Sequence, residues 1–277
     1  MEQLSLDQRK EVQERYPDLK FPDPVLEPIW WGKRPTTRID GKKAIVDQSE
    51  NNVFGICSDL YQIVPYEDII KMVETTAKHL PEFGKIEITP QIIGAGEKML
   101  IKAKFVDTEY EIKKGDVVNP QITIRTSYDL GWKLIAAFGA FRLVCSNGMT
   151  VGKIFSKFAK RHMVSLNPEL LTKSIQEGMV NYSEQTGLWQ KWANKKLTND
   201  MYETLWEALP FSDGEKERIE QLPEVATGLI FGDPVSRKVA SVWDFNSALT
   251  QYITHEVKSD VRKVELEASV ANAFESI

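Results

Sequence analysis

Residues 141–152 read Phe-Arg-Leu-Val-Cys-Ser-Asn-Gly-Met-Thr-Val-Gly, an apolar run that stops at an Asn-Gly pair. Asn and Gly tolerate the positive φ angles of tight turns, so Asn147-Gly148 predicts a sharp exit from a β-strand. Residues 153–162 then repeat cations at helical spacing on one face and apolar residues on the other. These cations are Lys153, Lys157, Lys160 and Arg161. We therefore expect a strand, a turn and a basic helix.

Charge around this segment is segregated. The chain of 277 residues has a formal net charge of -5, yet no acidic residue lies between Asp129 and Glu169. The cations in that interval are Lys133, Arg142, Lys153, Lys157, Lys160 and Arg161. A negative protein does not bind nucleic acid over its whole surface, so a basic function requires a local patch. The segregation indicates an anionic partner, or else a solvated basic face neutralised by acidic C-terminal helices.

Composition and proline placement suggest three parts: a Pro-rich N-terminal extension over 1–40, an α+β core over 41–165, and a helical C-terminal region over 166–277. In the extension, residues 3–16 suit a short helix, and five prolines between 17 and 35 exclude a regular element afterwards. Trp30-Trp31 is expected to pin this arm to the body by apolar burial, with base stacking as the alternative.

The core pattern predicts strands at 43–47 and 53–64, a helix from Pro65 to about Leu80, and further strands at 85–105, 121–128 and 132–144. Gly94-Ala95-Gly96 breaks the first of the later strands. Helices are expected at 168–181, 237–255 and 259–274, and Ser212 and Glu215 form a capping-box pattern. The fold class is α+β: an antiparallel sheet with a helix–three-strand meander–helix core and a helical C-terminal region.

The remaining composition indicates a cytoplasmic protein. The N-terminal residues lack the basic and apolar regions of a signal peptide, and no apolar run reaches membrane-spanning length. Cys57 and Cys145 both lie in apolar runs, which is typical of reduced, buried thiols. We therefore expect no membrane contact and no disulfide framework.

Two catalytic interpretations compete with structural ones. Cys145 could act as a nucleophile with His79, His162 or His255, but a thiol at the end of an apolar strand usually packs as a small hydrophobe. A charged stretch could hold a nuclease metal, although it reads first as an exposed hairpin. Its residues are Asp107, Glu109, Glu111 and Lys113. Phosphate-loop and zinc spacings are absent, so we expect no cofactor, no metal and no catalytic residue.

A polar stripe marks the segment that begins at Trp243. Asn246 and Thr250 follow Trp243 by one and two helical turns, on roughly the same face. Polar groups on an apolar face form either a buried hydrogen-bond network, which we favour, or a groove that faces a ligand.

Three segments give the chain a resemblance to a known family. They are residues 53–64, residues 126–131 leading to 141–148, and residues 243–255. Each is similar to an element of domain of unknown function 932, the phage- and plasmid-like proteins of prophages, plasmids and genomic islands. The resemblance covers about residues 41–256, and Cys145, Asn147 and Gly148 are its most specific part.

The chain departs from the family pattern at three positions. Tyr128 and Leu130 replace the usual His and Gly, and Ser247 replaces the usual Asn, with Asn246 one place early. The resemblance implies a mobile-element protein, but it carries no established activity.

The helix–meander–helix order is also that of the Red-beta and Rad-type single-strand annealing proteins, an analogy at the level of fold. It leads to our hypothesis of a non-enzymatic phage or mobile-element protein that binds or anneals single-stranded nucleic acid, as a homo-oligomer. The basic helix, Lys133 and Arg142 would contact phosphates, and Trp132 or Phe141 would stack a base. The alternative is a host-interaction or anti-defence protein that binds a host enzyme through an acidic surface.

Overall fold

The computed structural model describes residues 4–32, 36–79, 81–142, 147–149, 158–160, 168–221 and 241–274. They form two antiparallel sheets with helices, which confirms the α+β class. The chain divides into two compact units that interleave along the sequence. Unit 1 comprises Met1–Phe105, Ile122–Ala137 and Ser156–Gln176, and unit 2 comprises Val106–Gln121, Phe138–Phe155 and Glu177–Ile277. The three-part division at residues 40 and 165 stays a prediction.

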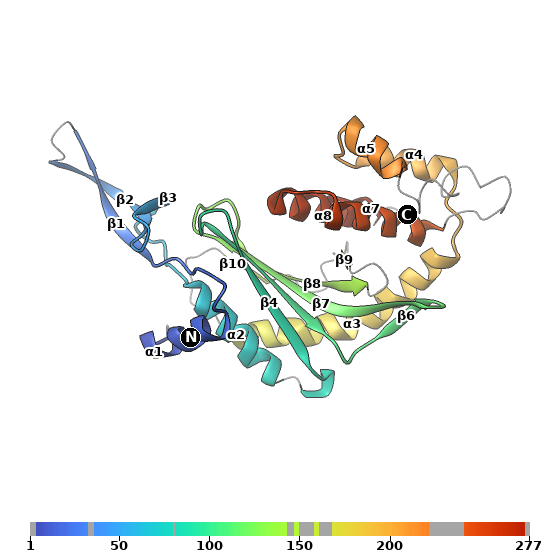
Figure 1. The fold of residues 1–277 in the computed structure, drawn as a ribbon, viewed down its shortest axis with the longest axis horizontal. Helices are drawn as coiled ribbons and strands as arrows, with labels where there is room; N and C mark the ends of the chain where they lie inside the picture. The colour runs from blue at the N-terminus through green and yellow to red at the C-terminus, as the bar shows by residue number, and fades with distance from the viewer. Residues whose placement is uncertain are drawn as a thin grey trace. The chain divides into compact units, whose positions relative to one another are not determined.

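The first sheet, in unit 1, has the order β1-β2-β3. Its strands are β1 (Pro24–Trp31), β2 (Thr37–Asp47) and β3 (Asn52–Ser58). β1 and β2 form the long hairpin of Figure 1. We predicted that the prolines would exclude a regular element here, and that is wrong: Pro24 and Pro28 both lie in β1. β1 is an edge strand, where the missing N–H can face solvent, and its register shifts between Pro28 and Trp30.

Two helices of unit 1 lie side by side and confirm the expected helical segments (Figure 1). α1 (Leu6–Arg15) begins at a capping box between Ser5 and Gln8, and α2 (Tyr66–Lys78) follows Pro65. The Arg9 side chain donates to the buried Asp68 carboxylate over 3.1 Å, which ties α1 to α2. The apolar stripe of α2 packs against β4 and β5. Desolvation raises the pKa of Asp68, although Arg9 opposes that effect.

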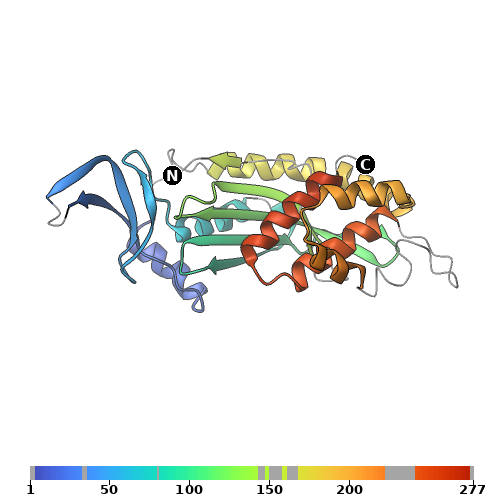
Figure 2. The same ribbon diagram turned by 90° about the horizontal axis from the view of Figure 1, so that it is seen from above.

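The second sheet has the order β10-β8-β7-β5-β4, with β6 paired to β7 and β9 paired to β8 (Figure 2). Its strands are β4 (Ile86–Ile93), β5 (Lys98–Phe105), β6 (Tyr110–Lys113), β7 (Asp116–Ser127), β8 (Leu134–Arg142), β9 (Asn147–Met149) and β10 (Phe158–Lys160). We expected a three-strand meander, but four long strands follow α2. The Gly94–Gly96 break is a hairpin turn that divides 85–105 into two paired strands, because both glycines take positive φ.

The C-terminal part of the chain is helical, as predicted. Its helices are α3 (Pro168–Asn194), α4 (Asn199–Ala208), α5 (Asp213–Glu220), α7 (Val242–His255) and α8 (Asp260–Phe274). A short 3-10 helix, η1 (Pro81–Phe83), lies earlier, after α2. α3 runs well past residue 181, where we expected it to end. The capping box at Ser212 and Glu215 is confirmed, with 2.8 Å between the Ser212 N–H and the Glu215 carboxylate.

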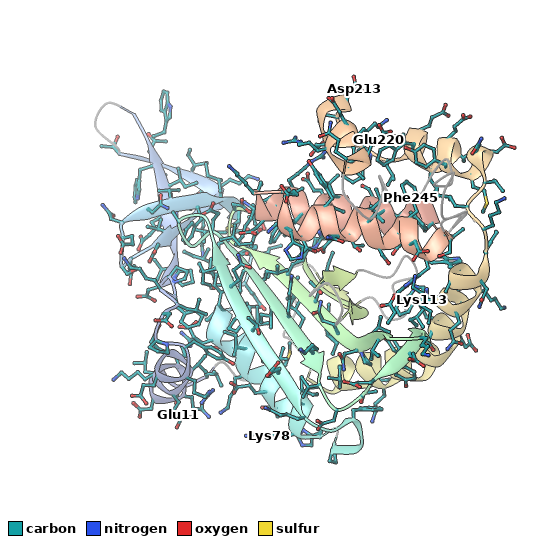
Figure 3. The ribbon with its side chains drawn as sticks, turned by 45° about the vertical axis from the view of Figure 1, so that its right-hand side comes forward. Glu11, Lys78, Lys113, Asp213, Glu220 and Phe245 are labelled. Atoms are coloured by element: carbon teal, nitrogen blue, oxygen red, sulfur yellow. The ribbon has the colours of Figure 1, made fainter. Side chains whose placement is uncertain are left out.

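The core of unit 2 is rich in aromatic rings. Phe245 on α7, labelled in Figure 3, lies 5.2 Å from the Tyr202 ring and 5.6 Å from the Trp206 ring, measured between centroids. α7 and α8 pack side by side, and ten of the 14 residues of α7 are buried. Such rings bury the most apolar area per residue and therefore dominate the stability of a core. In the described ranges, no helix has both the length and the apolar character needed to cross a bilayer.

Candidate nucleic-acid interface

The β1–β2 hairpin holds two adjacent tryptophans in solvent. Trp30 is 50% exposed and Trp31 is 71% exposed. We expected this pair to be buried against the body, and the exposed fractions show that prediction to be wrong. Each exposed indole leaves apolar area in water, which is costly and is suited to contact with a partner.

Cations accompany these rings. Arg38 lies directly across the ladder from Trp30, and Lys42 follows on the same strand. Both cations are exposed, and neither forms an ion pair with another described residue. We call Trp30, Trp31, Arg38 and Lys42 the hairpin site. An aromatic pair with unpaired cations can stack bases and neutralise phosphates.

The sequence carried a signal for this site that we did not use. Residues 30–43 hold five cations against the single carboxylate of Asp40, within a chain of net charge -5. The cations are Lys33, Arg34, Arg38, Lys42 and Lys43. Lys33 and Arg34 lie outside the described residues. Interleaved aromatic and basic residues are the usual composition of a single-strand interface.

The base of the hairpin is fixed by Asp47, which is 2% exposed. Its carboxylate accepts hydrogen bonds from the Asp23 N–H over 2.9 Å, the Ser49 N–H over 3.0 Å and the Ser49 hydroxyl over 2.7 Å. Burial alone would raise the pKa of Asp47, but these donors hold it below its ordinary value. The buried charge is therefore satisfied, and it orders the turn that leads into β3.

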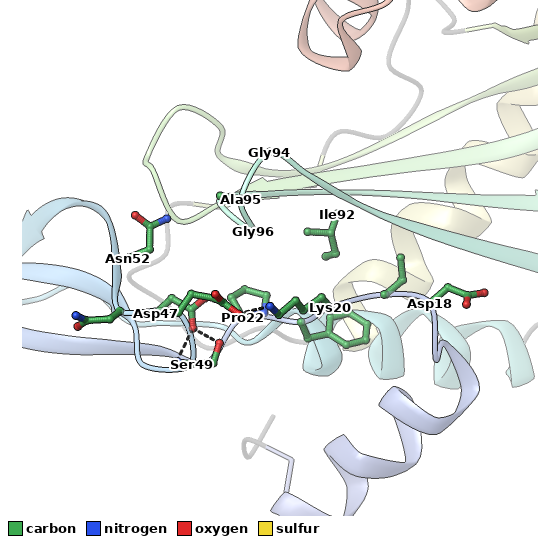
Figure 4. Close-up of a pocket in the computed structure, with 14 residues that line it drawn as sticks. Asp18, Lys20, Pro22, Asp47, Ser49, Asn52, Ile92, Gly94, Ala95 and Gly96 are labelled. Atoms are coloured by element: carbon green, nitrogen blue, oxygen red, sulfur yellow. Dashed lines mark hydrogen bonds and ion pairs between the residues drawn. The ribbon is translucent and has the colours of Figure 1, made fainter.

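A cavity of about 770 Å³ lies beside this base (Figure 4). Its walls include Asp18, Lys20 and Glu50 with the Gly94–Gly96 turn, and Lys20 pairs with Glu50 there. Carboxylates outnumber cations in the lining, so the cavity repels phosphate. It is therefore a poor continuation of a nucleic-acid path.

Aromatic residues from the first two segments of the family resemblance pack together next to β3. The Tyr66 and Tyr128 rings stack with centroids 4.3 Å apart, and Phe54 lies 5.6 Å from Tyr128. The Tyr128 hydroxyl donates to the Val64 carbonyl over 3.1 Å. Burial raises the pKa of Tyr128 well above its ordinary value. Tyr128, which replaces the usual His, is therefore a neutral packing group.

Cys57 confirms one of the two thiol predictions. It is 4% exposed, and its Sγ lies 3.5 Å from the Lys43 carbonyl oxygen. Burial raises the pKa of this thiol. Cys145 lies outside the described residues, so its role as core packing or nucleophile stays a prediction.

Trp132 is a poor stacking platform, contrary to our expectation. Its side chain is only 9% exposed, and Lys98 and Arg125 each place a cation 5.9 Å from the ring centroid. Lys98 also pairs with Asp129 in the preceding turn. Burial would raise the pKa of Asp129, but the Lys98 hydrogen bond helps to hold it below its ordinary value. The indole therefore belongs to a filled cation–aromatic cluster.

The predicted basic helix is contradicted where the structure describes it. Phe158–Lys160 form β10, paired antiparallel with residues 134–136 of β8. Lys153, Lys157 and Arg161 lie outside the described residues, as do the side chains of Lys160, Arg142 and Phe141. Lys133 is exposed just before β8. The free edge of β8 offers backbone hydrogen bonds that outweigh a weak local preference for helix.

The predicted turn at Asn147-Gly148 is also wrong. Arg142 pairs with Asn147 and Phe141 pairs with Gly148, so both residues belong to β9. Asn147 and Gly148 therefore lie within a paired strand rather than at a strand exit. β9 in turn lies next to α7, which brings the Asn147-Gly148 end of the second segment close to the third segment within unit 2.

On α7, the polar stripe is a partly satisfied network. Trp243 is fully buried, and its Nε1–H donates to the Asp116 carboxylate over 2.7 Å. The Thr250 hydroxyl donates to the Ser247 carbonyl over 2.9 Å. Asn246 is 4% exposed, and its Oδ1 has no hydrogen-bond partner among the described residues. The predicted hydrogen bonding is thus confirmed for Thr250, while the Asn246 oxygen is unpaired among the described residues.

The charged stretch after β5 forms a hairpin, as predicted. The Gly115 N–H at its turn donates to the Glu111 carboxylate over 2.9 Å, and Lys113, seen in Figure 3, pairs with Asp244 of α7. Burial would raise the pKa of Asp244, but donors from Lys113 and Ser241 hold it below its ordinary value. The part of the chain that is described contains no group of three or more His, Cys, Asp or Glu side chains suited to a metal ion.

These features define an α+β protein with an exposed aromatic–basic hairpin and no described metal cluster. The chain belongs to the family described as Domain of unknown function (DUF932), whose model matches residues 53–275. The β1–β2 hairpin precedes the matched region. No curated protein and no solved structure matches the chain.

Proposed function

We propose that the protein binds single-stranded nucleic acid without catalysing a reaction, and that the hairpin site is its principal contact. The observation that carries this proposal is the exposed Trp30-Trp31 pair on the same hairpin as Arg38 and Lys42, two exposed cations that form no ion pair with a described residue. Base–aromatic stacking contributes about 1–3 kcal/mol per base and tolerates any sequence, because every base has a π-face.

Electrostatics support the same ligand. A single strand is a polyanion, and neutralising its phosphates releases counterions, so the binding weakens as salt rises. The exposed Lys133 and the other cations up to Arg161 would add further phosphate contacts. Within that stretch we no longer assign a helix to residues 158–160.

The biological setting is part of the proposal. The family resemblance to phage- and plasmid-like proteins favours a role on mobile-element DNA, with strand annealing by a cytoplasmic homo-oligomer as the specific form. Strand annealing needs a protein that holds bases loosely and without sequence preference, which stacking and phosphate contacts provide.

One observation favours a second candidate, a host-interaction or anti-defence protein. α4 and α5 expose six acidic residues against two cations, Lys216 and Arg218. The acidic residues are Asp200, Glu203, Glu207, Asp213, Glu217 and Glu220. A surface of one charge sign attracts a basic partner.

The proposal is tested by fluorescence anisotropy with a labelled 25-nucleotide oligo(dT) at low salt. We expect binding by the wild-type chain and a weaker affinity, by about fivefold or more, in Trp30→Ala and Trp31→Ala. Leu6→Ala is the matched control, because Leu6 is 76% exposed on α1, outside the hairpin. Equal affinity in all four proteins excludes the hairpin site, and the absence of wild-type binding favours the host-interaction candidate.

A further inference from the structure

The two tryptophans of the hairpin site face opposite ways. Trp30 pairs with Arg38 and Trp31 pairs with Thr37, so they occupy successive rungs of one antiparallel ladder. Successive side chains of a strand point to opposite faces, and opposed pairs share a face. Trp30 and Arg38 therefore lie on one face of the ribbon, while Trp31 lies on the other.

The far end of this hairpin is only two strands wide. β3 pairs with β2 from Lys42 to Asp47, so residues 37–41 of β2 have no third strand beside them among the described residues. Figure 1 shows this part of β1 and β2 extending past β3. Trp31 at 71% and Trp30 at 50% exposure confirm that each face is open to a partner.

A single strand that follows one face of this ribbon can stack on only one of the two indoles. Both indoles are used when one strand passes along each face, as happens where two strands diverge from a duplex.

We propose that the hairpin is a wedge that holds two DNA strands, one against each face, at a fork between duplex and single strands. This inference rests on the proposed function and adds the substrate: branched DNA with two free arms. Aromatic side chains inserted where bases unstack recover part of the lost stacking, which favours an opened junction over a continuous duplex.

The test uses a forked DNA with a duplex stem and two non-complementary arms, next to the same stem carrying one arm. A 2-aminopurine in either the 5′ or the 3′ arm reports stacking on that arm alone. We expect the wild-type chain to bind the fork about fivefold or more tightly than either one-armed DNA. We also expect Trp30→Ala to remove the fluorescence response of one arm and Trp31→Ala that of the other.

The outcomes separate this inference from the function on which it rests. If oligo(dT) binds but the fork is no better than a one-armed stem, the wedge is wrong and single-strand binding stands. The same conclusion follows if both variants silence the same arm, because one strand then contacts both indoles. If neither oligo(dT) nor the fork binds at low salt, both proposals are wrong. Leu6→Ala controls for the loss of an exposed apolar side chain and should change neither response.

Discussion

Replacing Trp243 tests the core of unit 2 most severely. The side chain is fully buried, its ring centroid lies 5.7 Å from that of Trp189, and its indole N–H donates to Asp116 over 2.7 Å. Removing such a ring by Trp243→Ala leaves a cavity that costs about 3–5 kcal/mol. That is a large part of the 5–15 kcal/mol by which domains are typically stable. Trp243→Phe keeps most of the packing but takes a donor from a buried carboxylate, at about 1–3 kcal/mol.

The assay is urea unfolding followed by circular dichroism. With an m-value of about 2 kcal/mol/M, Trp243→Ala should lower the midpoint by about 1.5–2.5 M, and Trp243→Phe should fall between it and the wild type. Trp31→Ala makes the same chemical change at an exposed position and should alter the stability by no more than about 0.5 kcal/mol. An unchanged midpoint in Trp243→Ala would refute the buried position of the indole.

Three further substitutions probe local physics. Because the pKa of Asp244 is lower in the folded protein, its ionised form stabilises the fold at neutral pH, and this contribution is lost as pH falls below about 4 through the folded pKa. Urea titrations at several pH values should therefore show that the stability of Asp244→Asn falls less steeply with acid than that of the wild type. An identical dependence of stability on pH in the two proteins would contradict the pairing with Lys113. Gly96→Ala should lower the free energy of unfolding by about 1–3 kcal/mol, because φ is +101° and a Cβ would lie 3.4 Å from Pro22. A urea midpoint equal to that of the wild type would refute this. Gly187→Ala, at an open position in α3, should instead raise stability by about 0.5–1 kcal/mol, and a loss would show hidden crowding.

Elements with strong local signals were predictable from the sequence. The capping residues at Ser212 and Glu215 and the apolar stripe of α2 specify their helices without tertiary information. The charged hairpin at Lys113–Asp116 was equally readable from its turn residues.

Elements whose form depends on pairing were not predictable in the same way. β1 contains two prolines and is a strand only because it occupies an edge, and β10 is a strand because β8 offers it an unpaired side. Asn147-Gly148 has the composition of a turn but pairs with the end of β8. In each case a partner distant in the sequence overrides the local preference.

The candidate site was missed for a related reason. Trp30-Trp31 looked like a buried anchor because aromatic pairs usually are buried, and exposure is a tertiary property that periodicity did not reveal. Trp132 gave the opposite error, since its filled cation–aromatic cluster depends on Lys98 from another strand. The excess of cations in residues 30–43 was the available signal, but the longer basic stretch after Asp129 has more cations and no acidic residue.

The most direct test of the account is the salt dependence of oligo(dT) binding in a charge-depleted hairpin. Arg38→Gln with Lys42→Gln removes two exposed cations from the hairpin site. Lys10→Gln with Lys258→Gln removes two exposed cations elsewhere and is the matched control. The slope of log affinity against log salt changes by about 0.7 per phosphate contact on a single strand. We predict a slope flattened by about 1.4 in the hairpin variant and an unchanged slope in the control. Equal slopes in the hairpin variant and the wild type would contradict the account.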